Sequence, residues 1–200
     1  MNTLPHWWQN GVIYQIYPKS FQDTTGSGTG DLRGVTQRLD YLKTLGIDAI
    51  WLTPFYISPQ VDNGYDVANY TAIDPTYGTL DDFDELVARA HERGIRIVLD
   101  MVFNHTSTQH AWFRESLDKA SPYREFYIWR DGTPDALPNN WSPKFGGLAL
   151  ARRERAVLSA SVRAGAGGSQ LGKPGGARRA EKSVRVLGRS RRGRLASGRH

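Results

Sequence analysis

All 22 aromatic residues of this 200-residue chain lie before Leu148, and this break limits where a packed core can form. Residues 148–200 contain no Phe, Trp or Tyr and are dominated by Gly, Arg, Ala and Ser. Large apolar side chains supply most of the free energy that offsets the conformational entropy lost on folding. We therefore expect the folded part of the chain in residues 1–147 and a disordered tail in residues 148–200.

The charge of the chain divides at the same position. Residues 148–200 carry 14 Lys and Arg against 2 Asp and Glu, a net charge of +12, whereas residues 1–147 have a net charge of −6. The overall pI of about 9.7 therefore describes the tail, and it does not indicate nucleic acid as a specific partner of the folded part. The absence of cysteine excludes disulfides. Without a secretory leader or a run of about 18 apolar residues, we expect a cytoplasmic protein with no membrane partner.

Short apolar runs alternate with amphipathic segments over the first half of the chain. We expect strands at residues 12–18 and 47–54 and in the segment from Ile95 to His105. Helices are expected at residues 35–46 and 79–94, and a long loop at 55–79. This order is typical of parallel βαβ units, in which functional residues follow the carboxyl ends of the strands.

Local signals mark where these helices begin and end. Thr79 is a suitable N-cap and is followed by acidic residues, while Gly46 and Gly94 are suitable C-terminal caps. Beyond His105 the pattern loosens into a short helix near residues 110–120 and a turn-rich stretch whose aromatic residues look exposed.

Three polar clusters are candidate sites. Tyr65 and Asp66 lie in the long loop, and Asp100, Asn104 and His105 follow the third strand. The third cluster, Asp23 and Asp31, flanks a Gly-rich loop that lacks the Lys of a phosphate-binding P-loop. On residue types alone, turn formation and strand capping explain these clusters as well as a binding site does.

Five segments occur in the order and spacing of a known family. They are "GVIYQIYPKSFQD", "GDLRG", "LDYLKTLGIDAIWLTP", "NGYDVANYTAIDPTYGT" and "DMVFNHTS". Together they resemble the alpha-amylase family of glycoside hydrolases. The resemblance implies an α/β fold in which residues 1–105 form the N-terminal part of a (β/α)8 TIM barrel. Residues 106–147 would then begin domain B, the domain that this family inserts after the third strand.

The resemblance also implies a substrate and a reaction. Residues 4–147 are most similar to family members that act on trehalose 6-phosphate, with oligo-1,6-glucosidase or maltose-acting members as the alternative. The implied reaction is hydrolysis of an α-glucosidic bond with retention, and a small sugar is the expected partner. No cofactor is expected.

The same resemblance assigns roles to individual residues. Asp66 and His105 would bind hydroxyl groups of the glucosyl unit, and Tyr65 would stack on its apolar face. Asp100 would hold an arginine that lies later in the family's sequence, and Asn104 would brace the loop. Retention requires a nucleophile and an acid/base about 5 Å apart. In the family both follow later strands, so we expect no catalytic residue here and an inactive 200-residue chain.

The Gly-rich loop departs from the family pattern. Relatives that bind a cation there carry acidic or amide side chains at alternate positions, whereas this chain has Thr25 and Ser27 between Asp23 and Asp31. Neutral hydroxyls are poor replacements for carboxylates around a cation such as Ca²⁺. We therefore expect no metal site.

Three interpretations of residues 148–200 remain open: a basic arm that binds nucleic acid, a linker, and an out-of-frame reading of the gene. Codons shifted by one base can turn residues 148–151 into Trp-x-Trp. The same shift can turn residues 186–200 into a segment ending Asp-Gly-Leu-Arg-Leu-Asp-Val, which is similar to the family's nucleophile motif. Further segments match in order at one offset, so we favour a frameshift near Gly147.

Overall fold

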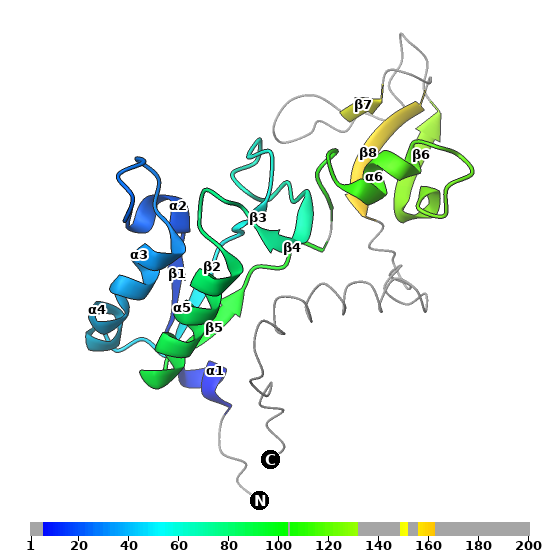
Figure 1. Cartoon of the computed structure of the whole chain (residues 1–200). Helices are drawn as coiled ribbons and strands as arrows, with labels where there is room; N and C mark the ends of the chain where they lie inside the picture. The colour runs from blue at the N-terminus through cyan, green and yellow to red at the C-terminus, as the bar shows by residue number, and fades with distance from the viewer. Residues whose placement is uncertain (1–5, 104, 132–148, 152–155, 163–200) are drawn as a thin grey trace, which may run out of the picture. The chain divides into compact units, whose positions relative to one another are not determined.

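The computed structural model describes residues 6–103, 105–131, 149–151 and 156–162 (Figure 1). These residues divide into two compact units. The first unit contains residues 6–55 and 71–101. The second contains residues 56–70 and 102–131, together with two strands from the tail.

A three-stranded parallel sheet in the order β1-β2-β5 forms the centre of the first unit. Its strands are β1 (Ile13–Ile16), β2 (Ala49–Leu52) and β5 (Arg96–Leu99). The register is continuous, from Ala49 opposite Ile13 and Arg96 to Leu52 opposite its neighbours at the other end. The central strand is the most buried, as its nearly continuous apolar run predicts. The predicted parallel βαβ arrangement is confirmed, but the third strand ends at Leu99 and does not extend to His105.

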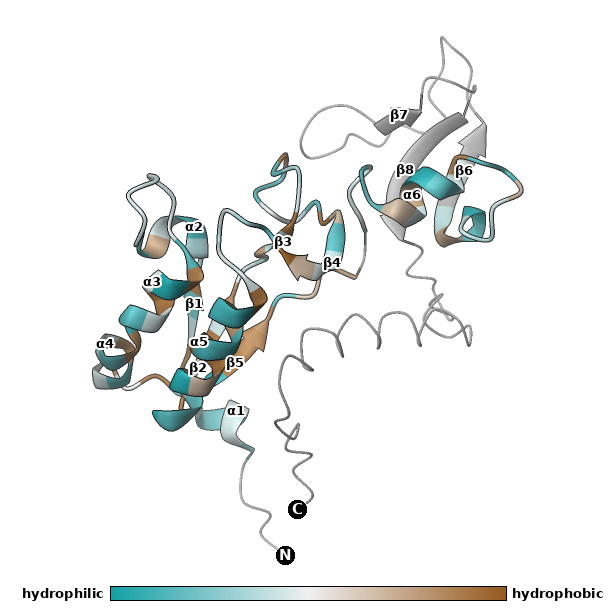
Figure 2. Ribbon diagram, in the orientation of Figure 1, coloured by the Kyte–Doolittle hydropathy of each residue, from teal (hydrophilic) through white to brown (hydrophobic). Residues whose placement is uncertain are grey.

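Five helices accompany this sheet in the described part of the first unit: α1 (Trp7–Asn10), α2 (Pro18–Phe21), α3 (Leu32–Gln37), α4 (Leu39–Thr44) and α5 (Leu80–Glu92). Figure 2 shows mainly hydrophilic residues along α4 and α5 and hydrophobic residues along β5. Phe83, Leu86 and Ala90 form the buried face of α5. Helix α5 therefore buries one apolar stripe, as amphipathic periodicity predicts.

The helix predicted at residues 35–46 differs from the structure. It begins at Leu32 and is divided at Arg38, whose backbone has φ −96° and ψ 5°. The Arg38 amide bonds to the carbonyl of Val35 at 3.1 Å, and its guanidinium donates twice to Gln22 Oε1. These contacts tighten the backbone locally and separate α3 from α4. Gly46 follows α4 with φ +82°, in the left-handed conformation expected after a helix end.

Helix α5 begins as predicted. Thr79 Oγ1 accepts a hydrogen bond from the amide of Asp82 at 3.2 Å, and the Asp82 carboxylate accepts one from the amide of Thr79 at 2.8 Å. This reciprocal capping box satisfies two amides that the first turn leaves without helical partners. Asp82 also accepts a hydrogen bond from Arg33 at 2.6 Å, which ties α5 to α3.

The expectation of one continuous loop over residues 55–79 is wrong. Strands β3 (Tyr56–Ile57) and β4 (Asn69–Ile73) lie within it and form a two-stranded sheet. The amide of Ala68 donates to the carbonyl of Ile57 at 2.8 Å. Tyr, Thr and Ile in β4 favour a strand, but the many Gly, Pro, Asn and Asp residues around them obscured this signal.

The second unit contains α6 (Ala111–Ser116), the 3-10 helix η1 (Arg124–Phe126) and strand β6 (Tyr127–Asp131). Helix α6 confirms the predicted short helix. The aromatic residues of the turn-rich stretch are not all exposed, contrary to expectation: Tyr127 is buried, and its ring centroid lies 5.3 Å from that of the buried Phe113 in α6. The Arg124 guanidinium stacks on the Trp129 ring at 3.5 Å.

Strands β7 (Ala149–Ala151) and β8 (Ala156–Val162) lie in the segment where composition predicts no regular structure. Strand β8 pairs antiparallel with β6 on one side and with β7 on the other, in the order β6-β8-β7. The β8 sequence "AVLSASV" is a local apolar run, and it pairs along the length of β6. The rest of the predicted tail, residues 152–155 and 163–200, lies outside the described residues.

Candidate functional site

The carboxylate of Asp66 is held by three donors from its own loop. Oδ1 accepts hydrogen bonds from Ser58 Oγ at 2.7 Å and from the amide of Asp62 at 3.1 Å. Oδ2 accepts one from the amide of Val61 at 2.9 Å. Hydrogen bonds to an ionised acceptor are stronger than those between neutral groups, so they fix both oxygens of this side chain.

The turn that carries these donors has an unusual backbone. Gln60 has φ +60° and Asn63 has φ +51°, and both therefore lie in the left-handed region that non-glycine residues rarely adopt. Such a conformation costs on the order of 1 kcal/mol per residue. The hydrogen bonds to Asp66, together with the bond from the amide of Tyr65 to the carbonyl of Asp62, offset that cost.

His105 binds the adjoining residue of the same loop. Its Nε2 lies 3.0 Å from the carbonyl oxygen of Tyr65. Because a carbonyl oxygen can only accept, Nε2 must carry the hydrogen. In the tautomer that carries this hydrogen, Nδ1 has a lone pair and can accept a hydrogen bond.

Two further contacts join the segment around His105 to the segment after Asp66. The hydroxyl of Tyr70 donates to the carbonyls of Val102 at 2.5 Å and His105 at 2.8 Å. The amide of Ser107 donates to the carbonyl of Val67 at 2.9 Å. Burial raises the pKa of Tyr70, so its hydroxyl keeps its proton at neutral pH. Tyr65, Asp66 and His105 are thereby brought together within the second unit.

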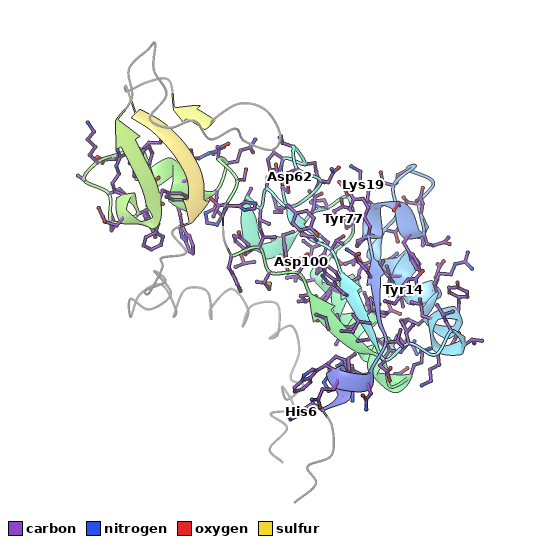
Figure 3. All side chains as sticks on the ribbon, turned by 180° about the vertical axis from the view of Figure 1, so that it is seen from behind. His6, Tyr14, Lys19, Asp62, Tyr77 and Asp100 are labelled. Carbon is purple, nitrogen blue, oxygen red and sulfur yellow. The ribbon has the colours of Figure 1, made fainter. Side chains whose placement is uncertain are left out.

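Of the two predicted supporting residues, the structure describes Asp100. Asp100 follows β5 in the first unit, where its amide donates to the carbonyl of Leu52 at 3.2 Å (Figure 3). It therefore lies at the carboxyl end of a parallel strand, as expected. Asn104 lies outside the described residues.

Ser58 and Tyr70 hold the site although no sequence motif marks them. Ser58 is buried and positions Asp66, but in the sequence it stands before a proline and reads as an ordinary turn residue. Tyr70 is also buried, and an aromatic residue in a strand reads as core. Only the spacing of Ser58 and Asp66 across one turn-rich loop offered a signal, and it was too weak to use.

Neither a metal centre nor a membrane span emerges in the part of the chain that the structure describes. Within residues 6–103, 105–131, 149–151 and 156–162, no three His, Asp or Glu side chains group so as to hold a metal ion. Over the same residues, no helix combines the length and apolarity that crossing a bilayer requires. Asp23 and Asp31 each accept hydrogen bonds from their own loop.

The sequence matches known glycoside hydrolases over most of its length. Trehalose-6-phosphate hydrolase from Escherichia coli (strain K12) is 84% identical over 149 residues, which are 74% of this chain and 27% of that protein. Oligo-1,6-glucosidase from Heyndrickxia coagulans is 57% identical over 148 residues, covering 73% of this chain and 27% of the relative. The chain thus spans about a quarter of the length of these relatives.

A solved structure agrees with these sequence matches. The crystal structure of Bacillus licheniformis trehalose-6-phosphate hydrolase superposes with a TM-score of 0.78 at 43% identity, covering 90% of this chain and 33% of that one. Residues 15–156 match the family described as "Alpha amylase, catalytic domain". The chain therefore belongs to the alpha-amylase family of glycoside hydrolases.

Proposed function

We propose that residues 1–147 are the N-terminal part of an enzyme that hydrolyses trehalose 6-phosphate to glucose and glucose 6-phosphate with retention. The 84% identity to the Escherichia coli trehalose-6-phosphate hydrolase carries this proposal. The oligo-1,6-glucosidase from Heyndrickxia coagulans is only 57% identical over nearly the same length. In the proposed enzyme, residues 1–105 begin a (β/α)8 barrel and residues 106–147 begin domain B.

The geometry around Asp66 supports a sugar-binding role in this enzyme. A carboxylate has about four lone-pair sites, and Asp66 uses three of them on Ser58, Val61 and Asp62. It is therefore rigid and retains capacity for one sugar hydroxyl. His105 contributes Nδ1 as an acceptor, and Tyr65 contributes a ring for the apolar face of the sugar.

The bond cleavage itself would come from residues beyond the matching part. A retaining enzyme needs a nucleophile and an acid/base about 5 Å apart, and binding of the glucosyl unit alone does not replace them. In the complete enzyme Asp100 would hold an arginine beside the nucleophile. We therefore expect the 200-residue chain to bind sugar weakly and to have no hydrolytic activity.

A chimera tests the proposal directly. Residues 1–147 replace the corresponding part of Escherichia coli trehalose-6-phosphate hydrolase, and kcat/KM is measured on trehalose 6-phosphate and on isomaltose. The unaltered relative is the control for folding and activity. We expect a strong preference for trehalose 6-phosphate and no activity in the Asp66→Ala chimera. A preference for isomaltose would overturn the substrate assignment, and an active Asp66→Ala chimera would overturn the site.

Oligo-1,6-glucosidase activity is the second candidate, because 57% identity to such an enzyme is substantial. The described residues contain no feature that we can assign to the phosphate group of trehalose 6-phosphate. The substrate therefore depends on sequence identity, and the isomaltose arm of the chimera experiment decides between the two.

We also propose that residues 148–200 are encoded out of frame. The 84% match leaves 26% of the chain without a counterpart, and the aromatic residues end at the same region. Reading the nucleotides from codon 140 onward tests this. We expect the frame shifted by one base to be open and to encode Arg-Leu-Asp-Val near its end. Stop codons in that frame would contradict the proposal.

A further inference from the structure

The loop from Asp23 to Asp31 has the spacing of a calcium-binding loop. In such loops, positions 1, 3 and 5 carry side-chain ligands, position 7 carries a carbonyl ligand, position 9 often binds through water, position 12 is a bidentate Glu and position 6 is glycine. Position 12 of this loop is Gly34. With Asp23 at position 1, Gly28 falls at position 6, and its φ of +83° is the left-handed value that this sharp turn requires. Thr25 and Ser27 fall at positions 3 and 5, where carboxylate or amide oxygens are usual.

The hydroxyl of Thr25, at position 3, donates a hydrogen bond to Asp23, the side chain at position 1. Thr25 Oγ1 lies 3.0 Å from Asp23 Oδ1, which also accepts the amides of Thr25 at 2.8 Å and Gly26 at 2.9 Å. Asp23 Oδ2 accepts the amide of Gly28 at 2.7 Å. Three of these four donors act on Oδ1, which has two lone pairs, so Oδ1 is saturated, while Oδ2 accepts one donor. The amides of Thr25 and Gly28 hold the pKa of Asp23 at about 2, so the carboxylate is charged at all physiological pH values.

The hydroxyl at position 5 occupies the next ligand in the same way. Ser27 Oγ donates to the carbonyl of Thr29 at 3.1 Å, which is the position 7 ligand, and accepts the amide of Thr29 at 3.2 Å. At position 9, Asp31 accepts Thr24 through its amide and hydroxyl and caps α3 through the amide of Gly34 at 2.7 Å. The atoms that a cation would need are therefore turned toward hydrogen donors of the loop itself.

From this donor set we propose that hydroxyl hydrogen bonds from Thr25 and Ser27 take the place of the cation in this loop. The loop is then closed without a divalent ion, and N–H and O–H dipoles with their positive ends toward Asp23 disfavour one. The backbone frame of a calcium loop is retained, so new oxygen ligands at positions 3 and 5 create a cation site. This inference does not depend on the proposed function.

The test compares four proteins, each as the 200-residue chain and as the chimera. They are the parent, Thr25→Asn/Ser27→Asp, Thr25→Val/Ser27→Ala, and the matched control Thr44→Val, which removes a hydroxyl that donates to a carbonyl within a helix. Calcium binding is measured by titration calorimetry, and the midpoint of thermal unfolding is measured with CaCl₂ and with EDTA. Hydrogen exchange of residues 23–31 reports on the closure of the loop.

For the parent, we expect no heat of calcium binding and the same midpoint of thermal unfolding in CaCl₂ and in EDTA. Thr25→Asn/Ser27→Asp should bind calcium and show a midpoint that rises with its concentration. Thr25→Val/Ser27→Ala should exchange the loop amides at least about tenfold faster, with no rescue by calcium, whereas Thr44→Val should leave them unchanged. Calcium binding by the parent, unchanged exchange without the two hydroxyls, or no calcium binding by the Asn/Asp variant would overturn the inference. None of these readouts requires an active enzyme.

Discussion

His110 should make the second unit less stable in mild acid. The ring is 7% exposed, and its Nδ1 accepts the amide of Trp112 at 3.1 Å, which caps helix α6. The rings of Tyr70 and Trp112 lie against it, with centroids 5.6 Å and 4.9 Å away. Desolvation in this apolar site lowers the pKa of His110 from 6.5 to about 4. Protonation would also place a hydrogen on Nδ1 and remove the acceptor that caps the helix.

The sign and size of the effect follow from proton linkage. Below pH 6.5 the unfolded chain takes up a proton on this ring that the folded chain binds only near pH 4, so stability falls as the pH drops through this window. A shift of this size corresponds to a loss of about 3 kcal/mol between pH 7.5 and pH 4. Above pH 6.5 this ring should contribute no pH dependence.

Urea unfolding of the chimera at a series of pH values from 7.5 to 4 measures this loss. His110→Asn keeps an N-cap acceptor but cannot be protonated, so its free energy of unfolding should fall about 3 kcal/mol less over the same range. His91→Asn, on the exposed side of α5, is the matched control and should follow the parent. An identical pH profile in the parent and in His110→Asn would refute the reasoning. So would an NMR titration that places the pKa of His110 above 6.

Two other predictions concern single contacts, and a third concerns the charge of residues 148–200. Ser58→Ala removes the 2.7 Å hydrogen bond to Asp66 and should lower kcat/KM of the chimera about tenfold. The control Ser121→Ala removes only a hydrogen bond from the amide of Tyr123 and should leave kcat/KM unchanged. Equal activities of the two variants would contradict the role of Ser58. Thr79→Ala removes the capping box of α5 and should lower the free energy of unfolding, measured with a chemical denaturant, by about 1 kcal/mol. Thr108→Ala, at an exposed position, should leave it unchanged. An unchanged unfolding midpoint for Thr79→Ala would contradict this prediction. Deletion of residues 148–200 removes a net charge of +12 and should abolish salt-sensitive retention of the chain on a polyanion column. Binding that survives the deletion, or that distinguishes nucleic acid sequences, would favour a specific nucleic-acid function instead.

The elements that the sequence predicted correctly are those set by local patterns. The apolar run of β2, the N-cap at Thr79 and the glycines after the helices depend on residues close in the chain. The break at Arg38 was not predictable in this way. It involves the side chain of Gln22, 16 residues away, and no propensity of Arg38 itself indicates a helix end.

The residues of the candidate site also divide into those that sequence motifs predict and those that they do not. Family motifs led to Tyr65, Asp66 and His105, and the structure brings these three together. The residues that hold them, Ser58 and Tyr70, act through a buried hydroxyl on a carboxylate and through a phenol shared by two carbonyls. Such contacts leave no pattern in the sequence, because the partner of a Ser in a turn or of a Tyr in a strand is known only once the fold is known.

In the Asp23 loop, the hydrogen bonds in the structure say more about cation binding than the absence of the calcium-loop motif does. From the sequence, Thr25 and Ser27 indicated only that two cation ligands were absent. The structure adds that their hydroxyls donate to Asp23 and to the carbonyl of Thr29, which are ligand positions of the same loop. Loss of ligands alone would leave repelling oxygens around an open turn, and a cation would still stabilise it. Donors in those places remove both the repulsion and the need for the ion, so the two cases predict opposite responses to calcium.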